Sequence, residues 1–137
     1  YFFANQAYNA NELTINDQLY LLESQIIHSL AEKGPCVIIG RCADYVLREH
    51  KHTLNVFVHA DIEFRKKRAV EHYGISPKKI EEFLHKQDKH RAHYHSFYTD
   101  QKWKAIENYD LTIDSSRFGV DASVEMIIAA AKIKSGI

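Results

Sequence analysis

The chain has 137 residues, of which 45% are apolar and 26% are charged, a composition that is ordinary for a soluble domain with a buried core. No apolar run approaches the roughly 20 residues that a membrane-spanning helix needs, so we expect no membrane partner. The two cysteines, Cys36 and Cys42, do not form a CxxC pair. We interpret them as free thiols, which favours a reducing compartment and predicts a cytoplasmic protein.

The net charge is zero, but the charges are unevenly distributed along the chain. Residues 65–104 contain eleven Lys and Arg against five Asp and Glu, whereas the segments on both sides of this range are acidic. Such a cationic segment suits an anionic ligand. A solvated helix face is the alternative interpretation of the same charge bias.

The first half of the chain predicts two helices and two strands. Residues 15–33 form the first helix, with a cap at Thr14 or Asn16, and apolar side chains recur at helical spacing at Leu19, Leu22, Ile26, Ile27 and Leu30. The apolar run 36–40 predicts a buried strand that ends at a glycine. A short helix then extends to about residue 50, and residues 54–60 predict a second buried strand.

The second half predicts three helices and a third strand. Helices are expected over 61–74 and over 77–98, the second one starting at Ser76-Pro77, and residues 110–115 predict a strand. The closing helix, 120–134, places Val124, Ile127, Ile128 and Ala131 inward. This alternation predicts one α/β domain over residues 1–137, with a parallel sheet and flanking helices, and continuously apolar strands predict that the sheet is covered on both faces.

Polar side chains follow each predicted strand, at the edge where ligands bind in open α/β sheets. Arg41 follows the first strand, Asp61 follows the second, and the third is followed by Asp114, Ser115 and Ser116. The guanidinium of Arg41 could bind a phosphate or carboxylate in a bidentate manner. Alternatively, Arg41 pairs with a neighbour such as Asp44 and caps the helix.

Two pairs of charged residues recur at a spacing of three on the predicted helices. Arg65 and Arg68 share one face, and Asp88 and Arg91 repeat the spacing on the next helix, followed on a nearby face by Tyr94 and Tyr98. A carboxylate beside an arginine can hold the guanidinium while it binds a substrate. The alternative is a plain intrahelical ion pair, which contributes only about 0.3–0.5 kcal/mol.

The same basic segment allows two further interpretations. His90 and His93 share a face, but without an HExxH motif or a cysteine partner a solvated histidine pair is favoured over a metal site. A nucleic-acid surface is the other alternative, on the interleaved cations and aromatic rings of Lys86, Lys89, Arg91, Tyr94, Tyr98, Lys102 and Trp103. No module motif accompanies these residues, so a nucleic-acid partner is not favoured.

Four sequence blocks together resemble the cytidylate kinase-like family of nucleoside monophosphate kinases. They are "GPCVIIGRCADYVL", "NVFVHADIEFRKKRA", "KQDKHRAHYHSFYTDQKW" and "YDLTIDSS", and the similarity extends from about Gln25 to Ile128. The resemblance implies a P-loop NTPase fold and transfer of a phosphoryl group from ATP, with Mg²⁺, to a small pyrimidine nucleotide such as CMP.

The resemblance also implies roles for particular residues. Arg41 would contact the acceptor nucleotide, and Asp88 and Arg91 would contact its base or phosphate. Arg65 and Arg68 would be catalytic arginines of a helical lid over residues 65–104, which closes over the transferring group. The donor nucleotide would lie near the "IDSS" segment, against Asp114, Ser115 and Ser116.

The sequence departs from the family pattern at two places. Cys42 stands where the family has an aspartate after the Gly-Arg pair, and the chain contains no Gly-Lys dipeptide and therefore no GxxxxGK[ST] phosphate loop. We expect the chain to be the C-terminal two-thirds of a kinase-like domain without its first strand, with "YFFANQAYNANELT" as the tail of an acceptor-binding helical region. The alternative is a catalytically inactive regulatory or oligomerising domain of the same fold, and pairing with a second copy through the gap is possible.

Overall fold

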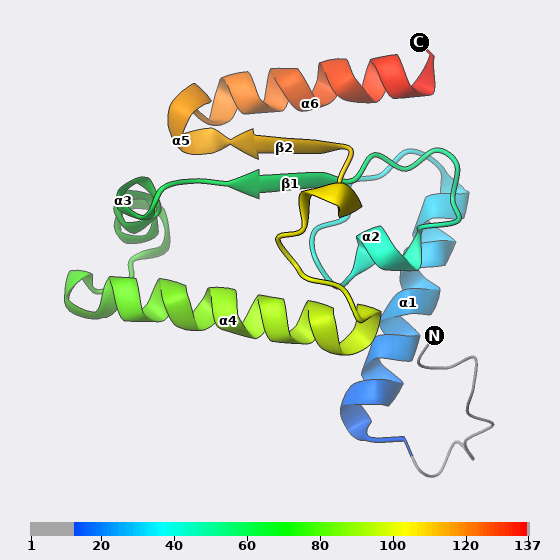
Figure 1. The fold of residues 1–137 in the computed structure, drawn as a ribbon, viewed down its shortest axis with the longest axis horizontal. Helices are drawn as coiled ribbons and strands as arrows, with labels where there is room; N and C mark the ends of the chain where they lie inside the picture. The colour runs from blue at the N-terminus through cyan, green and yellow to red at the C-terminus, as the bar shows by residue number, and fades with distance from the viewer. Residues whose placement is uncertain (1–12, 137) are drawn as a thin grey trace.

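The structure is a computed structural model that describes residues 13–136. Residues 1–14, which we expect to be the tail of an acceptor-binding helical region, therefore lie outside the described residues except for Leu13 and Thr14. The elements, in chain order, are α1 (Ile15–Lys33), α2 (Ala43–Val46), β1 (Val56–His59), α3 (Ile62–Tyr73), η1 (Pro77–Lys79), α4 (Ile80–Thr99), η2 (Ile106–Asn108), β2 (Leu111–Asp114), α5 (Ser115–Phe118) and α6 (Val120–Ser135) (Figure 1).

The sheet has two parallel strands, with Val56 of β1 opposite Leu111 of β2 and His59 opposite Asp114. Helix α6 lies along β2, and α4 lies on the side of β1 away from β2 (Figure 1). Both strands point toward the end of the sheet where α3 and α5 begin. The fold is thus a mixed helix–strand arrangement with a small parallel sheet flanked by helices.

The predicted strand over residues 36–40 is wrong for the described structure, where these residues form no strand. The side chains of Val37 and Ile39 are 91% and 87% exposed, whereas Ile38 packs against the core. An apolar run becomes a strand only where a neighbouring strand accepts its backbone hydrogen bonds, and within residues 13–136 none pairs with this segment.

Helix α1 begins where the sequence predicts, but its buried face differs. Thr14 is the cap, and a reciprocal capping box with Asp17 fixes the first turn. Of the apolar residues predicted to face inward, Ile27 is buried, whereas Leu19, Leu22, Ile26 and Leu30 are all more than 40% exposed. The ring of Tyr20 provides much of the packing instead, because it stacks on Tyr98 of α4 with ring centres 4.1 Å apart.

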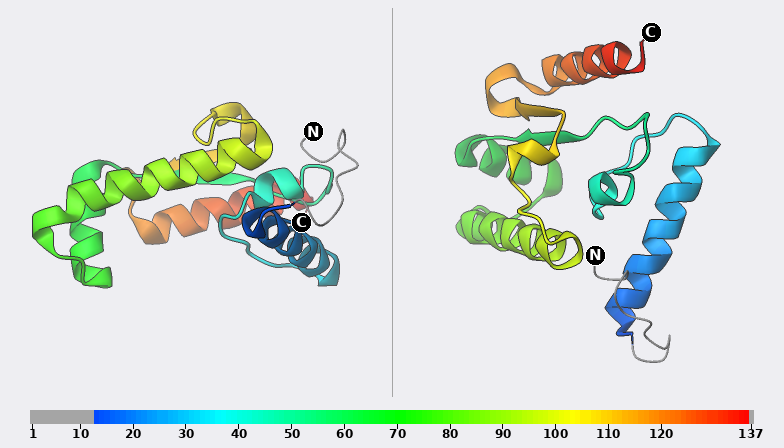
Figure 2. Two further views of the ribbon diagram at one scale, coloured as in Figure 1. Left: turned by 90° about the horizontal axis from the view of Figure 1, so that it is seen from below. Right: turned by 45° about the vertical axis from the view of Figure 1, so that its right-hand side comes forward.

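Helix α2 lies between α1 and the sheet in Figure 1 and in the right-hand view of Figure 2. It is much shorter than the predicted helix, which extended to about residue 50. The larger core cluster forms around it, where residues of α1, α2 and α4 meet: Tyr20, Ile27, Cys42, Ala43, Val46, Leu47 and Tyr98. A smaller cluster of Ala69, Ile80 and Leu84 joins α3 to α4.

The remaining elements lie near their predicted positions, but β1 is shorter than the predicted 54–60, and η2 and α5 were not predicted. The turn η1 precedes α4, which begins at Ile80 and not at residue 77. The strand β2 ends at Asp114, because that side chain accepts from the backbone N–H of Ser116 and caps α5. The predicted inner face of α6 is only partly covered, since Ile127 is half-buried whereas Val124, Ile128 and Ala131 are exposed.

The sheet is also less covered than the continuously apolar strands predicted. Val58 on β1 is 53% exposed, and the burial of β2 is complete only at Ile113. No helix among residues 13–136 is both long enough and apolar enough to cross a membrane.

Candidate anion-binding site

The backbone before α2 presents Arg41 on a tight left-handed turn. Gly40, Arg41 and Cys42 all have positive φ angles, of 71°, 56° and 57°. The N–H of Ala43 donates to the carbonyl of Gly40 at 3.1 Å, so Arg41 and Cys42 are the two central residues of a turn that normally selects Asn and Gly. Two consecutive non-glycine residues in this region are strained, and such strain concentrates at functional sites.

The guanidinium of Arg41 is held by groups from α1 and α4. Its Nε and Nη2 donate to the carboxylate of Glu23 at 2.8 and 2.6 Å, and its central carbon lies 4.5 Å from the ring centre of Tyr94. The hydrogen bond to Glu23 raises the pKa of Arg41. The alternative pairing of Arg41 with Asp44 does not occur, since Asp44 accepts from His95 at 2.8 Å.

A second cluster forms around Asp88, where α3 meets α4. Arg65 donates from both terminal nitrogens to the two oxygens of Asp88, at 2.7 and 2.8 Å, and Arg91 donates to the same carboxylate at 2.9 Å. Burial opposes ionisation of Asp88, but the hydrogen bonds and charge of Arg65, followed by the charges of Lys104 and Arg91, outweigh it and lower the pKa. The predicted Asp88–Arg91 pair is therefore present, and Arg65 joins it.

These two clusters lie along one face of α4. Asp88, Arg91 and Tyr94 follow one another at intervals of three residues, so they share a face and span about 9 Å along the helix axis. The face gathers three guanidinium groups from separate elements: Arg65 from α3, Arg91 from α4 itself and Arg41 from the turn before α2.

Arg68 lies one turn further along α3 than Arg65 and is not part of the pairing with Asp88. Its guanidinium carbon is 6.0 Å from the ring centre of Phe64. The predicted pair of lid arginines thus separates into one residue that is bound to α4 and one that stays on the surface of α3.

Trp103 borders this face beside Arg91. The guanidinium of Arg91 and the ammonium of Lys104 lie 5.8 and 5.7 Å from the centre of its ring, and Phe57 of β1 meets the ring edge-on at 5.4 Å. Because Trp103 is the single tryptophan of the chain, its fluorescence reports on the surroundings of Arg91.

The residues after β1 and β2 form a separate group whose members bind one another. Ser116 donates to Asp114 and accepts from the N–H of Asp61, and Ser115 donates to the carbonyl of His59 at 3.1 Å. The pKa of Asp61 is lowered by the backbone N–H of Phe64 and by Ser116, and that of Asp114 by Ser116. Arg41 was predicted to open toward this edge, but it lies against α1 and α4 instead.

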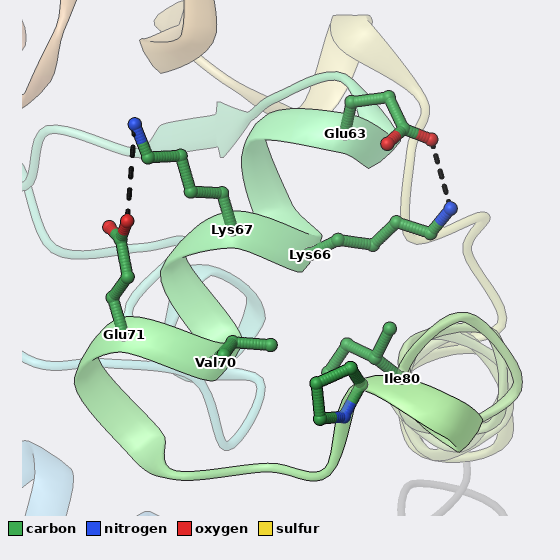
Figure 3. A pocket seen from close by; sticks show the side chains of 7 residues that line it. Glu63, Lys66, Lys67, Val70, Glu71 and Ile80 are labelled. Atoms are coloured by element: carbon green, nitrogen blue, oxygen red, sulfur yellow. Dashed lines mark hydrogen bonds and ion pairs between the residues drawn. The ribbon is translucent and has the colours of Figure 1, made fainter.

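A shallow groove of about 460 Å³ lies between α3 and the start of α4 (Figure 3). Lys66 and Lys67 face it, and each is paired with a carboxylate, Lys66 with Glu63 and Lys67 with Glu71. None of the predicted site residues lines this groove, so it is distinct from the arginine-bearing face of α4.

The described residues do not offer a complete site for ATP and Mg²⁺. Across residues 13–136 no three His, Cys, Asp or Glu side chains come together as a metal site, and the whole sequence lacks a GxxxxGK[ST] motif. Asp88, the carboxylate between Arg65 and Arg91, already binds both arginines.

Sequence reasoning missed two contributors to this region. Glu23 lies 18 positions from Arg41, inside a helix that the pattern treats as core packing, so no local signal marks it. His95 was given no role by the sequence, whereas the structure buries it to 4% exposure against Asp44. No local signal marks this pair either, since His95 and Asp44 are 51 positions apart.

Together these features define a mixed helix–strand protein whose helix α4 gathers arginines from three elements. The chain belongs to the cytidylate kinase-like family, whose model matches residues 1–117. A kinase-like family implies, at a coarse level, proteins that bind nucleotides, transfer phosphoryl groups and use a metal ion.

The fold also has a counterpart among solved structures. It is similar to the crystal structure of an uncharacterized protein from Eubacterium ventriosum ATCC 27560, with a TM-score of 0.80 and 30% sequence identity over 88% of this chain and 68% of that chain. No curated protein matches the sequence significantly.

Proposed function

We propose that the chain is a nucleoside monophosphate kinase-like protein of the P-loop type, which binds the phosphate of a pyrimidine mononucleotide such as CMP on the arginine-bearing face of α4. The observation that carries this proposal is the convergence of Arg41, Arg65 and Arg91 on about 9 Å of one helix face. Phosphoryl transfer requires positioning and positive charge around the transferring group, and arginine supplies both.

Each arginine has a role in this proposal. Arg41 and Arg91 bind the acceptor, with Asp88 orienting Arg91. Arg65 and Arg68, on α3, supply positive charge to the transferring group as part of a lid over residues 65–104. Asp88 holds Arg65 against α4, and exchange of this carboxylate for phosphate oxygens would free Arg65 to contact the transferring group.

ATP with Mg²⁺ is the donor that the family relationship suggests, near Asp114, Ser115 and Ser116. These three side chains are engaged in capping α5 and in linking β2 to β1. Because the chain has no phosphate loop, we expect it to bind ATP more weakly than CMP.

A nucleic-acid surface is the weaker alternative, because many cations of the basic segment are already paired. Lys66 binds Glu63 and Glu81, and Lys67 pairs with Glu71, so these two lysines of α3 are engaged within the protein. Phosphate-backbone binding needs cations that are free to replace counterions.

Titration of the 137-residue chain with CMP, followed by the fluorescence of Trp103, tests the proposed function. We expect CMP and UMP to change the signal and cytidine, which lacks the phosphate, to bind at least tenfold more weakly. The Arg91→Ala variant should lose about ten- to a hundredfold in CMP affinity, because charge-assisted hydrogen bonds contribute about 1.5–3 kcal/mol.

Lys89→Ala is the matched control, since it removes a cation from the exposed surface of the same helix. CMP affinity of this variant should stay within about twofold of the wild type. Equal affinity for CMP and cytidine, or equal losses in the two variants, would contradict the proposal. Tight oligonucleotide binding with a steep salt dependence would favour the nucleic-acid alternative. Formation of CDP from ATP and CMP would contradict the inactive-domain interpretation.

A further inference from the structure

Glu23 occupies the edge of Arg41 that an anionic ligand would use. Two carboxylate oxygens face two N–H groups of one guanidinium, through Nε and Nη2, which is also the geometry in which a phosphate binds arginine. We infer that Glu23 is an internal competitor for this site, which a bound phosphate must displace. The inference rests on the proposed role of Arg41 in acceptor binding.

The pair is accessible to a competing anion. The side chain of Arg41 is 45% exposed and that of Glu23 is 23% exposed, so solvent ions reach the guanidinium while the carboxylate remains close to it. Exposed pairs of this kind contribute little to stability, so a ligand with more negative charge than a carboxylate can replace Glu23.

Tyr94 holds both members of the pair on α4. Its ring lies under the guanidinium of Arg41, and its hydroxyl donates to Glu23 at 3.2 Å. Burial, together with the nearby carboxylate, raises the pKa of Tyr94, so the phenol remains a hydrogen-bond donor at neutral pH. Displacement of Glu23 would therefore break one connection between α1 and α4, while the stack of Tyr20 on Tyr98 would remain.

Glu23 could affect phosphate affinity in two ways, by competing with the phosphate for Arg41 or by orienting Arg41, and we expect competition to be the stronger effect. Without Glu23, Arg41 would still be held by the ring of Tyr94 and by the turn that Ala43 and Gly40 close. A negative charge about 4 Å from a bound phosphate, in contrast, lowers its affinity by about sixfold even with the full screening of bulk water, and by more at a half-exposed position. Removal of the charge should therefore tighten anion binding.

Titration with inorganic phosphate tests this inference in the 137-residue chain. The readout is the side-chain Nε–Hε signal of Arg41 in a ¹⁵N-correlated NMR spectrum, assigned by its loss in Arg41→Ala. We expect Glu23→Gln to bind phosphate about tenfold more tightly than the wild type. Tyr94→Phe, which keeps the ring but removes the bond to Glu23, should bind slightly more tightly.

Glu32→Gln is the matched control, because it removes the same charge from an exposed position of the same helix. Its phosphate affinity should stay within about twofold of the wild type. If Glu23→Gln binds no more tightly than Glu32→Gln, or binds more weakly, Glu23 is not a competitor and the inference is overturned although Arg41 can still bind anions. Arg41→Ala lacks the reporter signal, so its phosphate affinity is measured by calorimetry beside the wild type. If this variant binds phosphate as well as the wild type, the proposed role of Arg41 fails and the inference fails with it. A Glu23→Asp variant, which keeps the charge, should bind phosphate more weakly than Glu23→Gln.

Discussion

At the residue scale, the two cysteines differ in environment although they lie six positions apart. Cys42, one of the two central residues of the strained turn, is 4% exposed. Burial together with the charge of Asp44 raises the pKa of its thiol to about 12. Cys36 lies on the exposed segment before the turn. The thiolate is the reactive form, so Cys42 is protected from modification both because it is buried and because its thiol remains protonated.

We therefore predict that iodoacetamide at about pH 8 modifies Cys36 roughly a hundredfold faster than Cys42 in the folded protein, because Cys42 is both inaccessible and protonated. Mass spectrometry of the two tryptic peptides gives both rates. In urea the two rates should converge. Comparable rates in the native protein would show that the turn carrying Arg41 opens readily.

At the element scale, the buried pair of His95 and Asp44 joins the end of α4 to α2. Nε2 of His95 lies 2.8 Å from Asp44, and its Nδ1 faces the hydroxyl of Thr99 at 3.2 Å and the carbonyl of Gln101 at 3.5 Å. The hydrogen bond to Asp44 raises the pKa of His95 above its ordinary value of 6.5, against the opposing effect of burial. The protonated imidazole thus strengthens the contact between the two helices.

The pair should make the free energy of unfolding depend on pH. A raised folded pKa gives a contribution that is complete below pH 6.5 and is lost as the pH rises through the folded value. We expect His95→Gln to destabilise the protein by about 1–3 kcal/mol near pH 5.5 and by less near pH 9. Urea unfolding of both proteins across this range measures the difference.

Asp44→Asn provides the control, because it removes the carboxylate and keeps the shape of the side chain. In that background His95→Gln should show much weaker pH dependence. A destabilisation by His95→Gln that grows with pH would mean that the neutral imidazole is the favoured form.

The elements also show what sequence patterns can and cannot specify. Thr14 and Asp61 each cap a helix, and the spacing of Asp88 and Arg91 gives an ion pair, because these contacts depend on residues three positions apart. The bonds of Arg65 to Asp88 and of Arg41 to Glu23 span 23 and 18 positions. They depend on how α1 and α3 pack against α4, which no local pattern contains.

The inner faces of α1 and α6 were mispredicted for a related reason. Apolar periodicity predicts which side chains share a face but not how much of that face another element covers. On α1, the stacked tyrosines Tyr20 and Tyr98 form the main contact, and Leu22 and Ile26 remain half exposed. The predicted strand over 36–40 likewise has the composition of a core strand but no neighbouring strand among the described residues.

At the scale of the whole molecule, exposed apolar side chains and a net charge of zero both favour association between chains. Val37 and Ile39 project from an extended segment that pairs with no strand among residues 13–136, a combination that promotes association between chains. With 18 positive and 18 negative side chains, the protein has little net charge at pH 7 to oppose such association.

We predict that the double substitution Val37→Lys and Ile39→Lys lowers self-association, because it places positive charges on the exposed extended segment. The protein should stay folded, because both side chains are exposed. Sedimentation velocity across a concentration series should show a shift toward monomer, and the free energy of unfolding should change by less than about 1 kcal/mol. Ile38→Lys is the contrasting variant, since Ile38 packs against the core and its replacement should cost about 1–3 kcal/mol. If the double variant instead unfolds while Ile38→Lys does not, then Val37 and Ile39 face the core and Ile38 faces solvent, which contradicts the arrangement described above.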